Sequence, residues 1–409
     1  MSNKVPQIRF NGYSDAWVQR NLASLGKVFT GNTPKTSENE NWTSDGTGHV
    51  WITPTDIQQL HTSNSDRHLS DIGWEKARVV PEKSVLITSI ASIGKNTINT
   101  VPAAFNQQIN AIVPEGADAE FILAVMEKES ARFASLAGQT ATAIINKTEF
   151  EKFKINAPSF DEQIRIGELF SKVDMLIAAN QRKLDLLKKQ KKGYLQKMFP
   201  KNGEKVPELR FAGFADAWEQ RKLIDLLNQP ITDGPHETPN LVEKGIPFIS
   251  ADAIVDNRID FSRKRGFITE EYDLQCRKKY GPELYDVYLV KSGSTVGKVA
   301  IVETTKQFNI WSPLAAMRCK GKTNPYFLYF LFQTKENQNQ VKSKASNGTQ
   351  PNLSMRELEQ FNVQISPLHD EQQKIGAFFK QLDSLITLHQ RKLDLLKEQK
   401  KGFLQNMFV

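Results

Sequence analysis

The chain has 409 residues, of which 39% are hydrophobic and 24% are charged, which is enough apolar material for two or three domains with buried cores. Its net charge of +8 and its pI near 9.2 favour a polyanionic partner. Two cysteines exclude a disulfide framework, and neither a secretory signal nor a membrane span is apparent, so we expect a cytoplasmic protein in a reducing compartment.

The chain opens on a segment that it later repeats. Residues 5–22 read VPQIRFNGYSDAWVQRNL, and residues 206–223 read VPELRFAGFADAWEQRKL. A second pair is closer still, because QRKLDLLKKQKKGYLQKMF at 181–199 recurs as QRKLDLLKEQKKGFLQNMF at 390–408. Repeated segments that enclose divergent inserts indicate two independent recognition modules held at a fixed distance.

The inserts between these repeats are weakly related to each other. Val85 to Lys95 matches Tyr288 to Lys298, each ending in a Gly-Lys pair, and residues 138–140 resemble residues 348–350. Short β-branched and aromatic runs broken by Gly, Pro and Asn predict strands with tight turns, and residues 119–137 and 325–343 predict helices. Each insert is therefore expected to be an α+β domain.

A long helix is predicted after each insert. Pro158 and Pro367 precede the sequence Asp-Glu-Gln, and about forty residues without another proline follow. Acids near the start and lysines near the end suit the helix macrodipole. At ~1.5 Å per residue, residues 161–199 would span nearly 60 Å and serve as a ruler.

Apolar residues recur in these helices at alternating steps of four and three, which predicts a coiled coil in which the two helices pack on each other. We expect an antiparallel pair with pseudo-two-fold symmetry, with the inserts at opposite ends, and we expect the polar residues Asn180 and His389 to set its register rather than to act in catalysis. The predicted seam residues are Ile166, Phe170, Val173, Ile177, Asn180, Leu184, Leu187, Ile375, Phe379, Leu382, Ile386, His389, Leu393 and Leu396.

With its repeated helices, its Asp-Glu-Gln starts, its QRKLDLLK-x-QKKG-x-LQ-x-MF endings and one Gly-Lys turn in each insert, the whole chain resembles the specificity subunit of type I restriction-modification enzymes. The resemblance implies a non-catalytic subunit in which each target-recognition domain reads one half of a bipartite, asymmetric site in double-stranded DNA. It implies spacer helices that fix the gap and dock two adenine-N6 methyltransferase subunits, with restriction subunits in the full complex. S-adenosylmethionine would belong to the methyltransferase partner, and this chain would hold no cofactor.

These repeats and the resemblance divide the chain into four parts. The expected recognition domains are residues 1–158 and 201–366, and the expected spacer helices are residues 159–200 and 367–409.

Candidate DNA-contacting residues lie in polar or basic stretches of both inserts. They are Asn32, Lys35 and Lys95 in the first insert, and His236, Arg263, Lys264, Arg265 and Lys298 in the second. Arginine often pairs with a guanine edge, whereas lysine commonly contacts phosphate, so the basic triple at 263–265 could do either. A solvated surface remains an alternative for the triple, and also for the lysine-rich residues 181–205.

Several tempting motifs point elsewhere. Residues 293–298 are one residue short of a phosphate loop and lack Ser or Thr after Lys298, so a turn between strands is the better interpretation. Asn324-Pro325-Tyr326-Phe327 lacks the second proline of an amino-methyltransferase loop, and the six histidines show no metal spacing. A stand-alone, double-headed DNA-binding protein with an architectural or regulatory role and a self-sufficient methyltransferase remain as alternatives.

Overall fold

The computed structural model describes residues 5–43, 46–137, 143–201, 203–346 and 351–409. The predicted likeness between residues 138–140 and 348–350 therefore lies outside the described residues. The chain forms two compact units: Met1–Arg182 together with Gln390–Val409, called the first unit, and Lys183–His389, called the second unit. The division into recognition domains and spacer helices at residues 158, 200 and 366 concerns DNA reading, and it stays a prediction.

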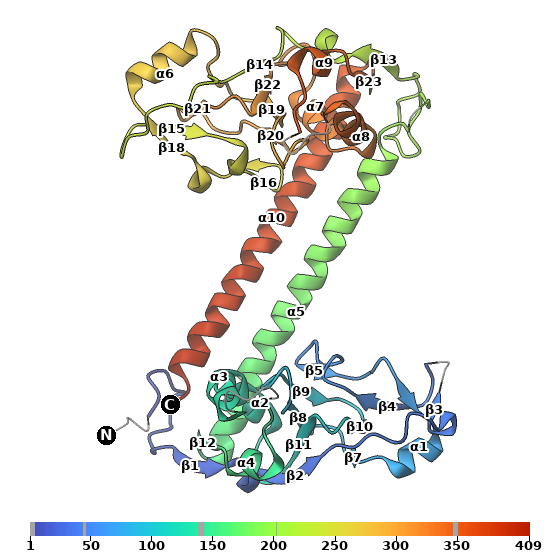
Figure 1. The fold of residues 1–409 in the computed structure, drawn as a ribbon, viewed down its shortest axis with the longest axis vertical. Coiled ribbons are helices and arrows are strands. Elements are labelled where there is room, and N and C mark those ends of the chain that lie inside the picture. Colours follow the sequence, from blue (N-terminus) through green and yellow to red (C-terminus); the bar gives the residue numbers. More distant parts are fainter. Residues whose placement is uncertain (1–4, 44–45, 138–142, 202, 347–350) are drawn as a thin grey trace. The chain divides into compact units, whose positions relative to one another are not determined.

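The first unit is an α+β domain, as predicted, and the strands among its described residues form three sheets (Figure 1). A two-stranded antiparallel sheet pairs β1 (Val18–Asn21) with β12 (Lys154–Ala157). One five-stranded sheet has the order β2 (Gly26–Thr30), β11 (Ile109–Pro114), β8 (Val85–Thr88), β9 (Asn96–Asn99), β5 (His61–Thr62). The other has the order β3 (Trp42–Thr43), β6 (His68–Leu69), β4 (His49–Ile52), β10 (Ala103–Phe105), β7 (Val79–Val80).

Helices complete this unit. They are α1 (Asp71–Lys76), α2 (Ala119–Lys128), α3 (Ser130–Ala134), α4 (Lys147–Lys152) and the beginning of α5 (Phe160–Lys197). The predicted helical segment at 119–137 is thus present but broken after Lys128. Helix α2 lies against β8 and β9, and its apolar side chains are buried there.

The second unit repeats the plan with shorter sheets. Strand β13 (Glu219–Lys222) pairs antiparallel with β23 (Asn362–Ile365). A four-stranded sheet has the order β14 (Thr232–Asp233), β22 (Leu314–Met317), β19 (Val287–Val290), β20 (Val299–Ile301), and a three-stranded one has the order β18 (Gly266–Ile268), β15 (Ile246–Ile249), β21 (Asn309–Ile310). A hairpin joins β16 (Ile254–Val255) and β17 (Arg258–Ile259).

The helices of the second unit are α6 (Glu270–Arg277), α7 (Pro325–Leu331), α8 (Lys335–Lys344), α9 (Met355–Glu359) and the beginning of α10 (His369–Asn406). The apolar residues 327–332, which form most of α7 and the position after it, are buried, and α7 lies against β19 and β20. Both predicted long helices are present, and each has 38 residues.

Each long helix begins in one unit and ends in the core of the other. Phe199, just after α5, contacts Trp218 and Phe327 in the second unit, at ring-centroid distances of 5.9 and 5.4 Å. Phe408, just after α10, contacts Trp17 and Phe121 in the first unit, at 6.0 and 5.8 Å. The repeated Met-Phe ending is therefore a core anchor, which explains why both copies keep it.

The helices pair antiparallel inside each unit, as predicted. In the first unit, Lys400 near the end of α10 lies 2.7 Å from Asp174 near the start of α5. In the second, Lys191 near the end of α5 lies 2.7 Å from Asp383 near the start of α10. The two lysines occupy matching positions of the repeated helices, and both form ion pairs.

The repeated arginine and glutamate side chains close each unit. Arg9 forms a two-pronged ion pair with the buried carboxylate of Glu162, at 2.7 and 2.8 Å. Arg210 does the same with Glu371, at 2.6 and 2.8 Å, and the Trp218 indole donates to that carboxylate at 3.2 Å. Bonding to glutamate raises the pKa of each arginine. These motif residues tie the N-terminal repeat to the helix start.

Candidate functional site

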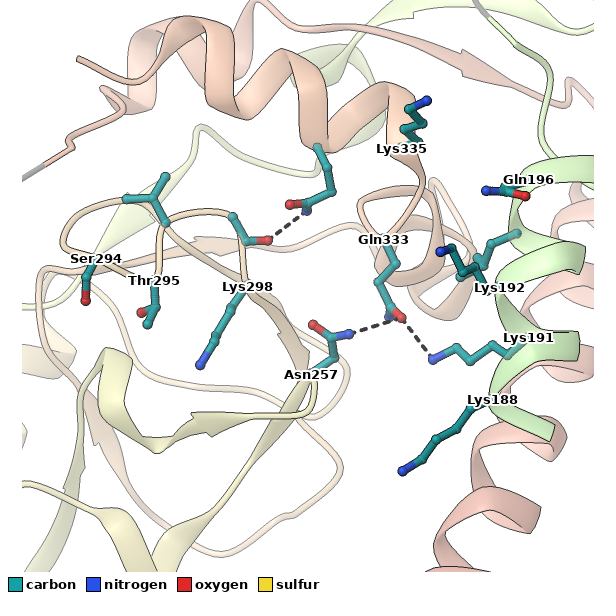
Figure 2. Close-up of a pocket in the computed structure, with 14 residues that line it drawn as sticks. Lys188, Lys191, Lys192, Gln196, Asn257, Ser294, Thr295, Lys298, Gln333 and Lys335 are labelled. Atoms are coloured by element: carbon teal, nitrogen blue, oxygen red, sulfur yellow. Dashed lines mark hydrogen bonds between the residues drawn. The ribbon is translucent and has the colours of Figure 1, made fainter. Parts of the chain in front are cut away.

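A basic cleft lies in the second unit between the end of α5, the turn before β20 and the start of α8 (Figure 2). Its volume is about 630 Å³. Five of its lining residues are lysines and none is acidic. They are Lys188, Lys191, Lys192, Leu195, Gln196, Asn257, Ser294, Thr295, Val296, Gly297, Lys298, Gln333, Lys335 and Gln338, and this set is called the basic cleft below.

The turn that carries Lys298 is fixed on both sides. Gly293 and Gly297 have φ of +95° and +97°, a region that L side chains rarely adopt. The Gln338 amide donates to the Gly297 carbonyl at 2.8 Å, and Gly293 N–H donates to the Pro351 carbonyl at 3.0 Å. The predicted turn between strands is therefore correct, since this segment joins the antiparallel strands β19 and β20.

Amide side chains lie between the lysines of α5 and the lysine of the turn before β20. Figure 2 shows Lys188 on α5 and Lys298 on the turn, with Gln333 and Asn257 between them. Gln333 Oε1 accepts from Lys191 Nζ at 3.0 Å and from Asn257 Nδ2 at 3.3 Å. Lys191 is neutralised by Asp383, whereas the other four lysines of the basic cleft are exposed and have no ion-pair partner among the described residues.

The equivalent position in the first unit has more acidic side chains. Asp118 and Asn324 cap the equivalent helices α2 and α7, which aligns Glu127 with Gln333 and Glu129 with Lys335. Glu127 and Asp174 lie 2.5 and 2.7 Å from Lys400, the counterpart of Lys191. Burial raises the pKa of Asp174, and the bond to Lys400 opposes that shift.

Two predicted residues of the basic triple contact aromatic rings. The Arg265 guanidinium lies 3.9 Å from the centroid of Trp311, and Lys264 Nζ lies 4.7 Å from that of Phe267. Arg263 is exposed at the end of a short 3₁₀ helix. A guanidinium that stacks on a ring can still donate from its edge to a base edge or a phosphate.

The remaining candidates differ in how much they are already engaged. The Asn32 amide donates to the Lys76 carbonyl at 2.9 Å, and its oxygen accepts from Arg78 N–H at 2.6 Å, so both ends are used in holding the loop. Lys35 is exposed and lies 3.2 Å from Glu38, and Lys95 is exposed. His236 lies 3.1 Å from the buried Asp233. Their contacts with DNA stay predictions.

Arg67 is a further candidate DNA-contacting residue that the sequence did not indicate. Arg67 is exposed and stacks at 3.8 Å on the centroid of Trp42, with Trp51 at 5.7 Å. It presents its guanidinium in the first unit as Arg265 does on Trp311 in the second. The tryptophans were the available signal, but their pairing with Arg67 depends on strands β3, β4 and β6 meeting in one sheet.

The predicted seam faces inward. None of its fourteen side chains is exposed, and ten are buried. The four half-buried ones are Ile177, Ile386, His389 and Leu396. Asn180 is buried and donates to the Leu176 carbonyl at 2.7 Å, in its own helix. Its role in register, and that of His389, stay predictions.

No helix among the described residues is long and apolar enough to cross a membrane. No group of three or more His, Cys, Asp or Glu side chains in the same part of the chain could hold a metal ion.

In sequence, the chain is similar to specificity subunits of type I restriction enzymes. A family model described as the type I restriction modification DNA specificity domain matches residues 14–189 and again residues 215–398. The specificity subunit of type I restriction enzyme MjaIX from Methanocaldococcus jannaschii is 23% identical over 420 residues, 96% of this chain and 92% of that protein. The HindI specificity subunit from Haemophilus influenzae is 30% identical over 149 residues, 35% of this chain and 32% of that protein.

A solved structure shares the fold. The crystal structure of the type I restriction-modification system S subunit from M. genitalium matches with a TM-score of 0.70, covering 99% of both chains at 15% identity. The two family-model matches fall on the two internal repeats.

Proposed function

We propose that this chain, which belongs to the family of type I restriction-modification DNA specificity domains, reads one half of a bipartite, asymmetric DNA site with each of its two units. One observation carries the proposal: the same frame of buried ion pair, capped helix and antiparallel helices encloses inserts with different surfaces. Arg67 on Trp42 and Arg265 on Trp311 sit in different strand contexts, which suits two different half-sites.

The proposal assigns the gap between half-sites to the long helices. Each is a continuous helix of 38 residues with one end in each unit's core. Because a packed helix is rigid over such a length, it would fix the number of unread base pairs.

Two methyltransferase subunits are proposed to dock on the outer helix faces. In the first unit, Leu176 and Leu395 are 49% and 59% exposed, and in the second unit their counterparts Leu385 and Leu186 are 46% and 48% exposed. Exposed leucines at repeated positions form equivalent apolar surfaces, which supports two copies of the same partner. Restriction subunits would join through that complex, which would act in the cytoplasm.

Methylation itself is assigned to the partner. S-adenosylmethionine is proposed to bind the methyltransferase subunit, and this chain to hold no cofactor. The Asn324-Pro325-Tyr326 segment supports this division, because Asn324 accepts from Phe327 N–H at 3.0 Å and thereby caps α7. An asparagine used in this way is not free to hold the amino group of a flipped base.

The direct test is single-base mapping of N6-methyladenine in the host genome with this gene intact and deleted. Loss of methylation at one motif of two defined halves around a fixed unread gap is expected. Unchanged methylation together with a chain that stays monomeric in gel filtration beside its methyltransferase would favour the stand-alone architectural protein instead. Binding of S-adenosylmethionine by this chain alone would contradict the assignment of methylation to the partner.

A further inference from the structure

We propose that the basic cleft of the second unit binds backbone phosphates of duplex DNA beside the half-site that this unit reads, and that the first unit contributes less to this contact. The inference rests on the proposed function. It adds a phosphate-binding site in the second unit and a difference between the two units in how strongly they contact phosphate. Lysine side chains positioned around an open cleft contact phosphate as mobile point charges, so they add affinity without reading sequence.

The charge of the cleft is not explained by folding. Lys188, Lys192, Lys298 and Lys335 have no ion-pair partner among the described residues, and like charges around one cleft repel one another. Lys335 is the first residue of α8, where the macrodipole disfavours a cation. A polyanion in the cleft would turn these costs into favourable contacts.

Neutral donors complete the site. Asn257, Gln333, Ser294 and Thr295 line the cleft beside the lysines, and amides and hydroxyls of these types commonly donate to phosphate oxygens. The turn is held by Gln338 and Pro351 before any ligand arrives, so little ordering is needed on binding.

The first unit has the same lysines but not the same charge. Lys95, Lys397, Lys400 and Lys401 are the counterparts of Lys298, Lys188, Lys191 and Lys192. Glu127 and Glu129, however, replace Gln333 and Lys335. Glu127 pairs with Lys400 and Glu129 pairs with Arg132. A phosphate near this position would therefore meet two carboxylates that the second unit lacks.

The test measures the salt dependence of DNA binding by the full chain, with a fluorescein-labelled duplex of mixed sequence followed by anisotropy. The cleft variant carries Lys188→Gln, Lys192→Gln and Lys298→Gln. Its mirror variant carries Lys397→Gln, Lys401→Gln and Lys95→Gln. Lys189→Gln is the single-site control for Lys188→Gln, because Lys189 is exposed on the same helix, lies outside the cleft and is Glu398 in the other repeat. Thermal unfolding checks that each variant is folded.

The cleft variant should flatten the slope of log K against log salt by about two to three units, since each phosphate contact contributes close to one. Between about 50 and 200 mM salt, its loss of affinity should then be about 40-fold smaller than that of the wild type. The mirror variant should flatten the slope clearly less, and Lys189→Gln should leave it unchanged.

Each other result decides against part of the inference. If the folded cleft variant bound DNA with the affinity and the salt slope of the wild type, the proposed site would be wrong. If the mirror variant flattened the salt slope as much as the cleft variant does, the proposed difference between the two units would be wrong. Inorganic phosphate that stabilises the wild type but not the cleft variant, with no change in DNA slope, would make the cleft a small-anion site. A wild type that binds no duplex at any salt concentration would overturn the proposed function as well.

Discussion

Two glycines in the long helices should not tolerate a methyl group. A Cβ on Gly376 would lie 2.7 Å from Asn324 Oδ1, 3.0 Å from Tyr326 Cβ and 3.1 Å from Phe327 N. A Cβ on Gly167 would overlap Asp118 Oδ1 and lie 2.9 Å from Glu120 Cβ. In each case the carboxamide or carboxylate that it strikes is the N-cap of the neighbouring helix.

The expected cost follows from three contributions. Overpacking costs about 1–3 kcal/mol, and a disturbed N-cap costs about 0.5–2 kcal/mol. The better helix propensity of alanine returns up to about 1 kcal/mol. Gly376→Ala and Gly167→Ala should therefore each lower the free energy of unfolding by about 0.5–5 kcal/mol, with Gly167→Ala the more damaging because its overlap is closer.

Gly193 and Gly402 provide matched controls in the same two helices. A Cβ at either position would meet nothing within 4 Å. Alanine there should stabilise the chain by about 0.5–1 kcal/mol, through helix propensity alone. Urea unfolding followed by circular dichroism measures all four variants, and a stability at least equal to wild type in Gly376→Ala would refute the close contact between α10 and α7.

Three further predictions follow from single contacts. Glu371→Gln should cost about 3–5 kcal/mol in urea unfolding, because it leaves the Arg210 charge buried without its partner, and a loss below about 1 kcal/mol would contradict that pairing. The bond to Glu120 raises the pKa of His61, so the stability that it adds is complete below the ordinary histidine pKa and is lost as pH rises through the folded pKa. The urea concentration at the midpoint of wild-type unfolding should therefore decrease as the pH is raised from about 6 to about 8. His61→Gln should remove most of that decrease. Lys264→Gln should weaken binding to every DNA sequence and flatten the salt slope by about one unit, whereas an unchanged slope would count against phosphate contact.

Sequence periodicity determined the long elements. The seam spacing from Ile166 onward identified which helix face is buried, because the α-helical repeat brings residues three and four apart onto one side. Likewise, the glycines of residues 293–298 indicated a turn, since positive φ at Gly293 and Gly297 is a local requirement. Each of these signals lies within a short stretch of chain.

The candidate site is different, because its parts are far apart in the sequence. Lys188, Asn257, Lys298 and Lys335 meet only after α5 has packed beside the turn and α8. Asn32 shows the converse: its amide suited a base edge by residue type, but Lys76 and Arg78 occupy both of its ends. Hydrogen-bond partners that come from distant strands leave no periodic trace.

The sequence by itself thus determined the two repeats, the two long helices, their inward face and the family resemblance, because repetition and helical periodicity are local properties of the chain. Only the tertiary structure decided which lysines share a cleft, that Arg67 stacks on Trp42, and that Glu127 and Glu129 occupy the places of Gln333 and Lys335. Those relations depend on long-range packing of an insert against a helix from elsewhere in the chain, and burial and charge at such contacts are set jointly by both partners.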